Sequence, residues 1–369
     1  MRRKAVLAVL MVLPALAAHA EDGSVTIYGV ADAFVQLLDG SSRLSRVQSG
    51  GLVGSRLGFK GSEDLGRGMK AFFTLESGLN LDEGVINQSG LVFGRQAQVG
   101  LSGSFGSVSL GRQYGSLYFA TTDMSIFTNA SAGPSTVLIG GFGGGYEPVR
   151  GASGSAVPPA AGATGNGSPL RVNNSLRYES PSYAGFKTSL LYGAGEQAGL
   201  TNQSRVIDLG LRYTRKGLDV IASFVSDRTA AGGAPEATDA QTRTLAAAYS
   251  FEAVRVVAGY LDFKDKRRSG QGAQNGRGAW LGAEYRLGPQ LLKVQYVLNQ
   301  PRHGTDNKTQ ALGVGWVCDL SRRSALYSSL TRFRNDDRAL RFNGAVPDGL
   351  VMAGDGSITE FALGIRHSF

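Results

Sequence analysis

The sequence predicts an all-β protein, a sixteen-stranded antiparallel barrel that spans a membrane. Two observations lead to this prediction: apolar and polar side chains alternate along most of the chain, and short and long connections alternate between these segments. The composition excludes other classes. Gly accounts for 53 of 369 residues, which is about twice the typical share of about 7%. Charged residues account for 18%, against a typical share of about 25%. One Cys and three His exclude a disulfide framework, a cysteine-based metal cluster and a histidine-rich metal site, so we expect no cofactor.

The N-terminus has the pattern of an export signal. Met1-Arg2-Arg3-Lys4 is basic, residues 5–18 are apolar apart from a proline, and Ala18-His19-Ala20 fits a small-x-small cleavage site. The apolar run is shorter than the roughly 20 residues that a spanning helix needs. We therefore predict a secretory signal peptide over residues 1–20 and a barrel domain over residues 21–369, with a buried N-terminal helix as the alternative.

Alternation with a period of two is typical of strands, because successive side chains point to opposite faces. It is clear in residues 207–213, 292–298 and 361–369. About sixteen such segments begin near residues 24, 50, 68, 91, 105, 171, 185, 204, 217, 241, 253, 277, 290, 308, 322 and 357.

The connections between these segments distinguish a membrane barrel from a soluble β-sandwich. Short turns are expected at residues 62–66, 103–105, 180–182, 215–217, 250–252, 287–289 and 319–321, and the other connections are longer and polar. A transmembrane barrel has short turns at one end and long loops at the other, with aromatic girdles near the strand ends. Candidate girdle residues are Tyr213, Tyr249, Trp280, Tyr285, Tyr296, Trp316 and Phe369.

Several segments, in order along the chain, resemble the general porins of Gram-negative outer membranes, in particular those of beta-proteobacteria. They are residues 24–32 (SVTIYGVAD), 54–66 (GSRLGFKGSEDLG), 93–101 (FGRQAQVGL), 110–114 (LGRQY) and 173–181 (NNSLRYESP), followed by the C-terminal Phe369. The resemblance extends through essentially the whole chain after the signal.

The resemblance implies a homotrimer of barrels in the outer membrane, with short periplasmic turns and long extracellular loops. Each barrel is then a water-filled channel for passive diffusion of small hydrophilic solutes and ions. The third loop, here residues 113–170, is expected to fold into the lumen and narrow it, although it is longer and richer in Gly, Ala and Pro than in the family. Phe369 resembles the signal read by the outer-membrane assembly machinery, and the surrounding partners are membrane lipids and lipopolysaccharide.

For the constriction, the resemblance implies basic residues on the barrel wall that face acidic residues of the third loop. Arg56, Arg95 and Arg112 match family positions that line it. Alternation against Leu57 and Phe59 also places Arg56 and Lys60 on the lumen face.

Further charged candidates lie around the loop. Arg171 and Arg177 share one strand face, Glu76 alternates with Leu75, and Asp123 and Glu147 are the loop's acids. Each of these residues could instead form a structural ion pair or a solvated loop charge.

Arg95 has the parity of Ala97 and Val99, which predicts Gln96 and Gln98 on the outer face. Polar groups are unfavourable against lipid, so this face is expected to lie in a subunit interface of the homotrimer.

The basic residues suggest a preference for anions. Without the three basic residues of the signal, 35 Lys and Arg face 29 Asp and Glu, a net charge of +6. Rings of Arg or Lys at a constriction favour anions. The alternative is a substrate-specific channel that uses the extended third loop as a binding site.

Other functions are disfavoured by the sequence. His303 and His367 lie in no catalytic motif, and no GxSxG, HExxH or GxxxxGK sequence occurs, so we expect no enzyme. The basic residues are spread over many strands, which argues against nucleic-acid binding.

Overall fold

The computed structural model describes residues 24–128, 130–135, 137, 170–194, 205–228, 240–265, 274–301, 308–335 and 356–369. The predicted signal peptide, Glu147 and residues 138–169 of the third loop lie outside this set. Within it the chain forms the strands β1 (Ser24–Asp39), β2 (Arg43–Ser49), β3 (Arg56–Gly66), β4 (Met69–Asn80), β5 (Val85–Ile86), β6 (Gln96–Gly103), β7 (Gly106–Tyr114), β8 (Arg171–Glu179), β9 (Phe186–Gly193), β10 (Arg205–Arg215), β11 (Leu218–Arg228), β12 (Ala240–Phe251), β13 (Val254–Asp265), β14 (Gln274–Leu287), β15 (Gln290–Pro301), β16 (Thr309–Asp319), β17 (Ser324–Asn335) and β18 (Ser357–Ser368), and the helices α1 (Asn87–Gly90) and α2 (Ser116–Thr122).

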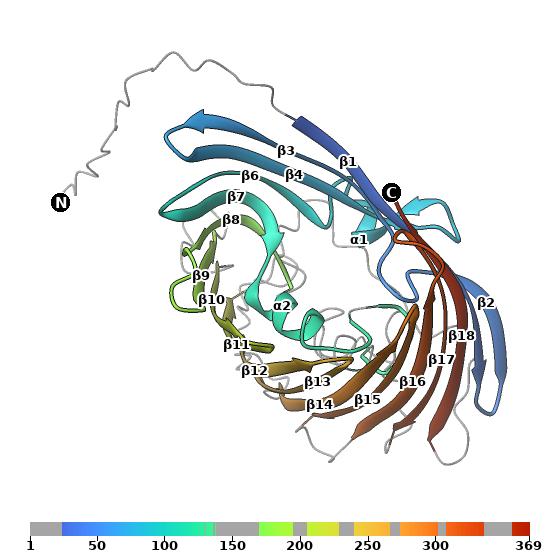
Figure 1. The fold of residues 1–369 in the computed structure, drawn as a ribbon. Coiled ribbons are helices and arrows are strands. Elements are labelled where there is room, and N and C mark those ends of the chain that lie inside the picture. The colour runs from blue at the N-terminus through green and yellow to red at the C-terminus, as the bar shows by residue number, and fades with distance from the viewer. Residues whose placement is uncertain are drawn as a thin grey trace, which may run out of the picture.

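The strands close into one antiparallel barrel with sixteen positions, as predicted (Figure 1). β2 and β3 both pair with β1, at Ala33–Asp39 and Ser24–Val30, and so share one position in the barrel. The two-residue β5 pairs with the end of β4 and adds no position. β18 pairs with β1 and closes the ring, which leaves no unpaired edge in lipid.

The period-two pattern separates an apolar outer face from a lumen face that carries most of the polar groups. On β10, Leu209 and Leu211 are exposed by 45% and 44%, whereas Asp208 on the same strand is exposed by 1%. The same alternation leaves Phe361, Leu363 and Ile365 outside on β18 and buries Glu360 inside. Lipid therefore meets a nearly continuous apolar band.

Aromatic side chains gather near the short turns, where a girdle was expected. Tyr249, Phe251, Tyr285 and Phe369 are all exposed on the outer face. Trp280 was wrongly assigned to this girdle: it is 3% exposed and donates its indole N–H to the carbonyl of Met124 inside the barrel. Its partner across the strands is Gly259 on β13, where a Cβ would collide with the indole ring, so the glycine leaves room for the ring on the lumen face.

The expected alternation of short and long connections fails at the first loop. β1 and β2 are joined by only three residues, 40–42, so the second strand position begins at Arg43 and not near residue 50. The first short turn is also displaced, because residues 62–66 belong to β3 and the chain reverses at Arg67-Gly68. The six other short turns join the strands as predicted. In the described part of the chain, neither helix has the length or apolar character needed to cross a membrane.

Candidate functional site

The described residues of the segment 115–137, which begins the third loop, lie inside the barrel (Figure 1). They are residues 115–128, 130–135 and 137, and the range 115–137 refers to them below. At their start, the N–H of Ser116 donates to Asp208 Oδ2 at 2.8 Å, and Ser116 Oγ lies 2.6 Å from Ser223 Oγ. Gly210 stands between these wall residues, and a Cβ there would lie 2.8 Å from the Cβ of Ser116. The absence of that side chain allows α2 to approach the wall.

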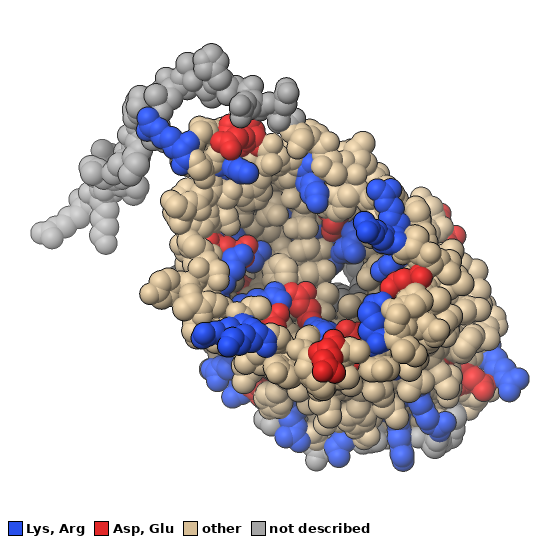
Figure 2. Space-filling model, in the orientation of Figure 1, with Lys and Arg blue, Asp and Glu red and all other residues tan. Residues whose placement is uncertain are grey.

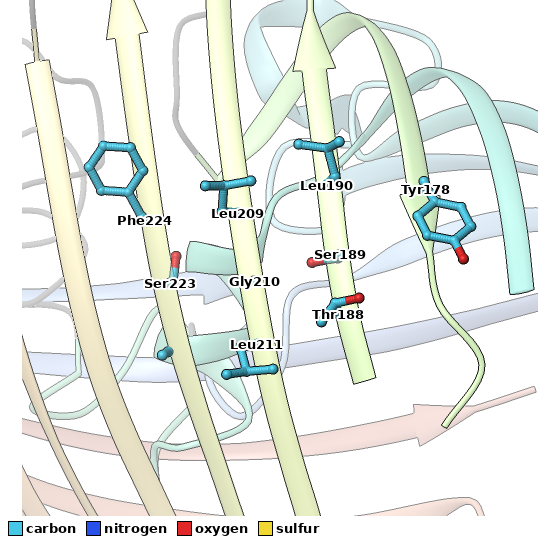
Figure 3. Close-up of a pocket in the computed structure, with 10 residues that line it drawn as sticks. Tyr178, Thr188, Ser189, Leu190, Leu209, Gly210, Leu211, Ser223 and Phe224 are labelled. Carbon is cyan, nitrogen blue, oxygen red and sulfur yellow. The ribbon is translucent and has the colours of Figure 1, made fainter. Parts of the chain in front are cut away.

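Figure 3 shows the same part of the wall with α2 behind the strands. Leu190, Leu209 and Phe224 from β9, β10 and β11 are paired neighbours and form an apolar row. Ser189, Gly210 and Ser223 form the next row, on the lumen face. The wall is therefore apolar toward lipid and small and polar toward α2.

The next residues of the loop bind the wall from β10 to β14. Arg212 Nη1 donates to Asp123 Oδ2 at 2.7 Å, and the Arg255 guanidinium donates to the Asp123 carbonyl. Trp280 Nε1 donates to the Met124 carbonyl at 2.5 Å. Asp123 thus lies in the lumen, but its carboxylate is paired with a wall arginine.

Further along, one glutamine and one glutamate fix the loop. Gln295 Oε1 accepts the N–H groups of Ile126 at 2.8 Å and Phe127 at 3.2 Å. Glu360 Oε1 accepts the N–H of Gly133 at 2.9 Å. Residues 115–137 therefore follow the inner wall from β10 to β18 and narrow the lumen.

A buried ion pair lies on the opposite wall. Arg95 Nε donates to Glu76 Oε1 at 2.6 Å, and both side chains are less than a tenth exposed. Tyr28 donates to Glu76 Oε2 at 2.9 Å and Tyr114 to Glu76 Oε1 at 3.2 Å. Arg95 therefore sits at the lumen wall with its charge neutralised by Glu76.

Arg56 and Lys60 lie beside this pair on β3. Their partners on β1 are Val30 and Thr26, and Lys60 Nζ lies 5.2 Å from the centre of the Tyr28 ring. Neither side chain makes an ion pair with any residue that the structure describes. Their charges therefore act on the lumen.

Arg171 and Arg177 both reach α2 but in different ways. Arg171 lies over the rings of Tyr114 and Tyr118, at 5.1 and 5.7 Å from their centres. Arg177 lies 5.2 Å from the centre of the Phe119 ring and 3.4 Å from Glu179. These two arginines support the helix against the wall.

Arg112 does not join this group. It pairs with Ala97, at a bulge in β7 next to Gly111, and its guanidinium donates to the Gly94 carbonyl and to Asn173 Oδ1. Through these two bonds, Arg112 connects β7 to β8 and to the segment before β6.

The expectation for Gln96 and Gln98 was wrong. Their partners across β4 are Glu76 and Thr74, so both face the lumen, whereas Val99 and Leu101 are exposed outside. Arg95 precedes the strand, so its direction does not follow the strand's parity. These two glutamines therefore do not indicate a subunit interface.

A second group of lumen cations was missed. Each lies within four residues of a strand end, either at a short turn or, for Arg366, at the C-terminal end of β18. The group consists of Lys187, Arg212, Arg255, Arg286, Lys293 and Arg366. The alternation signal was present, since Arg212 lies between Leu211 and Tyr213 and Lys293 between Leu292 and Val294.

Most of these cations are paired. Lys187 contacts Glu179 at 2.7 Å and Arg286 contacts Asp319 at 2.9 Å, whereas Lys293 lies 5.5 Å from the centre of the Phe127 ring. Figure 2 shows basic and acidic side chains gathered around and inside the hollow of the barrel.

A closed sixteen-position barrel with an apolar exterior, a charged lumen and an inserted loop defines the class of outer-membrane channels. The chain belongs to the Gram-negative porin family, which matches residues 5–338. It is therefore an outer-membrane porin.

Individual relatives agree with this assignment. "Outer membrane porin protein 32" of Delftia acidovorans is 33% identical over 98% of both chains. The solved "Anion-selective porin from Comamonas acidovorans" has a TM-score of 0.79 and 30% identity, covering 94% of this chain and 100% of that one. A trimer form of OmpT of Vibrio cholerae shares the fold alone, with a TM-score of 0.65 and 15% identity over 95% of this chain and 100% of that one.

Proposed function

We propose that the channel prefers anions and that its constriction lies between residues 115–137 and the wall at Arg56 and Lys60. The observation that carries the proposal is the pairing of the charges. Among the described lumen residues, Arg95, Arg177, Arg212 and Asp123 are in ion pairs, whereas Arg56, Lys60 and Lys293 are not. The lumen acids that the structure shows in no ion pair, Asp32, Asp208 and Glu360, are only 0–1% exposed. The unpaired charges that solutes can reach are therefore positive.

The size of the effect follows from Coulomb's law. Two unit charges 4 Å apart interact by about 1 kcal/mol in bulk water and by about 4 kcal/mol at an effective dielectric constant of 20. A narrow wet pore lies between these limits. Two or three unpaired cations are thus sufficient to change permeability ratios several-fold, and the Comamonas porin of similar sequence is named as anion-selective.

The test is the reversal potential of single channels in a salt gradient. We expect Arg56→Glu/Lys60→Glu to move it toward cations without abolishing conductance. Arg43→Glu/Lys216→Glu is the matched control, because Arg43 lies at the first hairpin with its side chain 85% exposed and Lys216 lies in a short turn. Cation preference in the wild type, or equal shifts in the two double variants, would refute the proposal.

We further propose that the protein is a homotrimer and that small hydrophilic solutes pass through it by diffusion. We also propose that it contacts lipopolysaccharide, that Phe369 is the signal for its assembly, and that it has no enzymatic activity. An unheated detergent extract is expected to migrate as an oligomer that boiling converts to monomer. A monomer in mild detergent would contradict the trimer, and conductance that saturates with one solute would indicate a substrate-specific channel.

A further inference from the structure

The second strand position of the barrel is interrupted next to the constriction. The pairing with β1 ends at Ala33–Ser49 and resumes at Val30–Arg56. Two residues of β1, Ala31 and Asp32, therefore lie opposite the six residues 50–55, which leave the ladder. We call residues 50–55 the excursion.

Asp32 binds the excursion along most of its length. Its carboxylate accepts the N–H groups of Gly51 at 3.1 Å, Leu52 at 2.9 Å and Val53 at 2.8 Å. Its carbonyl accepts from the N–H of Gly50 at 2.8 Å and from Ser55 Oγ at 2.9 Å. Asp32 is 0% exposed, so its carboxylate has lost its hydrogen bonds to water. The bonds to the excursion compensate for that loss.

A tyrosine and close packing direct the excursion into the lumen. Tyr327, on the lumen face of β17, donates its hydroxyl to Asp32 Oδ1 at 2.5 Å. Leu52 packs against the apolar cluster that includes Phe34 and Tyr327. A Cβ at Gly51 would lie 2.3 Å from the Tyr327 hydroxyl and 2.6 Å from the Phe34 ring, so this position requires glycine.

The far end of the third-loop segment rests on the excursion. The N–H of Ser131 donates to the Gly50 carbonyl at 2.8 Å, and Thr128 Oγ1 donates to the Leu52 carbonyl at 3.2 Å. Ala132 is buried in the same apolar cluster as Phe34 and Tyr327. The chain then continues into β3 at Arg56, directly after Ser55.

We infer that Asp32 is a positioning residue for the constriction: it folds residues 50–55 into the lumen, where they support Thr128, Ser131 and Ala132 of the third loop, and it fixes the start of β3 at Arg56. The inference rests on the proposed location of the constriction. The narrow part of the channel is then built from two inward segments, and the width and steadiness of the open pore depend on a residue that no solute touches.

The experiment compares Asp32→Ala with the control Asp319→Asn, which also removes one negative charge from the lumen. In the described structure, Asp319 bonds to neither the excursion nor residues 115–137. Single channels are recorded in planar bilayers. We expect Asp32→Ala to raise conductance and open-channel current noise, because the loop loses its seat, while the control leaves the noise at the wild-type level.

A second readout follows the excursion directly. In a Cys318→Ser background, Leu52→Cys is labelled with a small thiol reagent, and we expect Asp32→Ala to speed the labelling. A purely structural role would lower the unfolding midpoint in urea but leave noise and labelling unchanged in the folded fraction, and that result would overturn the inference.

A third variant covers a failure of Asp32→Ala to fold. Gly51→Ala keeps Asp32 and all charges but drives a methyl group into Tyr327 and Phe34, so it should give the same noisy channel. Wild-type noise in Gly51→Ala would overturn the inference. Because neither noise nor labelling reports ion preference, this test is separate from the reversal-potential test of the proposed function.

Discussion

Removing Glu76 should destabilise the barrel strongly and should also free a positive charge in the lumen. In Glu76→Gln, the carboxylate that neutralises Arg95 becomes a neutral amide of nearly the same shape. The single amide oxygen can still accept from Tyr114 at the Oε1 position, whereas the NH2 group replaces the Oε2 to which Tyr28 donates. The variant therefore loses the ion pair with Arg95 and, in addition, the acceptor of Tyr28.

The magnitude follows from the geometry. At 2.6 Å and an effective dielectric constant of 20, the two charges attract by about 6 kcal/mol. Desolvation opposes much of this attraction, and removing one partner of a buried pair typically costs about 3–5 kcal/mol because the other charge is left uncompensated. We expect a loss in this range for Glu76→Gln and for Arg95→Gln.

The assay is a double-mutant cycle in urea, followed by the fluorescence of the two tryptophans of the chain. The double variant should be more stable than the sum of the single losses predicts, with a coupling energy of roughly 1–3 kcal/mol. In bilayers, Glu76→Gln should shift the reversal potential further toward anions, since Arg95 is no longer neutralised. Additive losses, or a shift toward cations, would refute the assignment of this pair as a coupled, charge-neutral unit.

Three further predictions follow from the same geometry. The backbone of Phe369 exchanges two 3.1 Å hydrogen bonds with Gly29, so deleting Phe369 should leave little folded protein in the outer membrane. The measurement is heat-modifiable migration of membrane fractions, and wild-type levels would exclude a role in assembly. Gln295→Leu should make the pore noisy, because Ile126 and Phe127 lose the oxygen that accepts their N–H groups; the matched variant Gln290→Leu, at a short turn, should remain quiet, and equal noise in both would argue against a specific anchor. The anion preference should decline between 0.1 M and 1 M salt, where the screening length falls from about 10 to about 3 Å; a reversal potential that implies constant permeability ratios over this range would show that pore width, and not charge, sets the selectivity.

Strand number, closure and the outer face were predictable from the sequence because each depends on a local pattern. Residues 207–213 alternate so regularly that their lipid face could be assigned without tertiary information. The interruption of the second strand position was not predictable, because Gly50, Gly51 and Gly54 suggest a surface loop. Only the buried Asp32, far from them in sequence, explains why these residues turn inward.

For the site, residue type and parity placed Arg56 and Lys60 on the lumen face, but they could not tell paired from unpaired charges. Arg95 and Glu76 are 19 residues apart, and Arg212 and Asp123 are 89 apart, so their pairing depends on how the barrel closes. Arg112 was assigned to the constriction from the resemblance alone, and its parity offered no check, because an irregularity between Gly111 and Gln113 shifts the register of β7 against β8. A pattern of alternation carries no information across such a shift.

The seam between β1 and β18 has a consequence for biogenesis. Gln36 and Glu360, which bond across it, are separated by 324 residues, so β1 has no partner on that side until nearly the whole chain is present. An open strand edge is a template for pairing with other chains, and contacts between distant parts of a sequence form slowly. Until the barrel closes, the edges of β1 and β18 are therefore both open to pairing with other chains. The longer a newly exported chain remains in an aqueous compartment before closure, the higher its risk of aggregation.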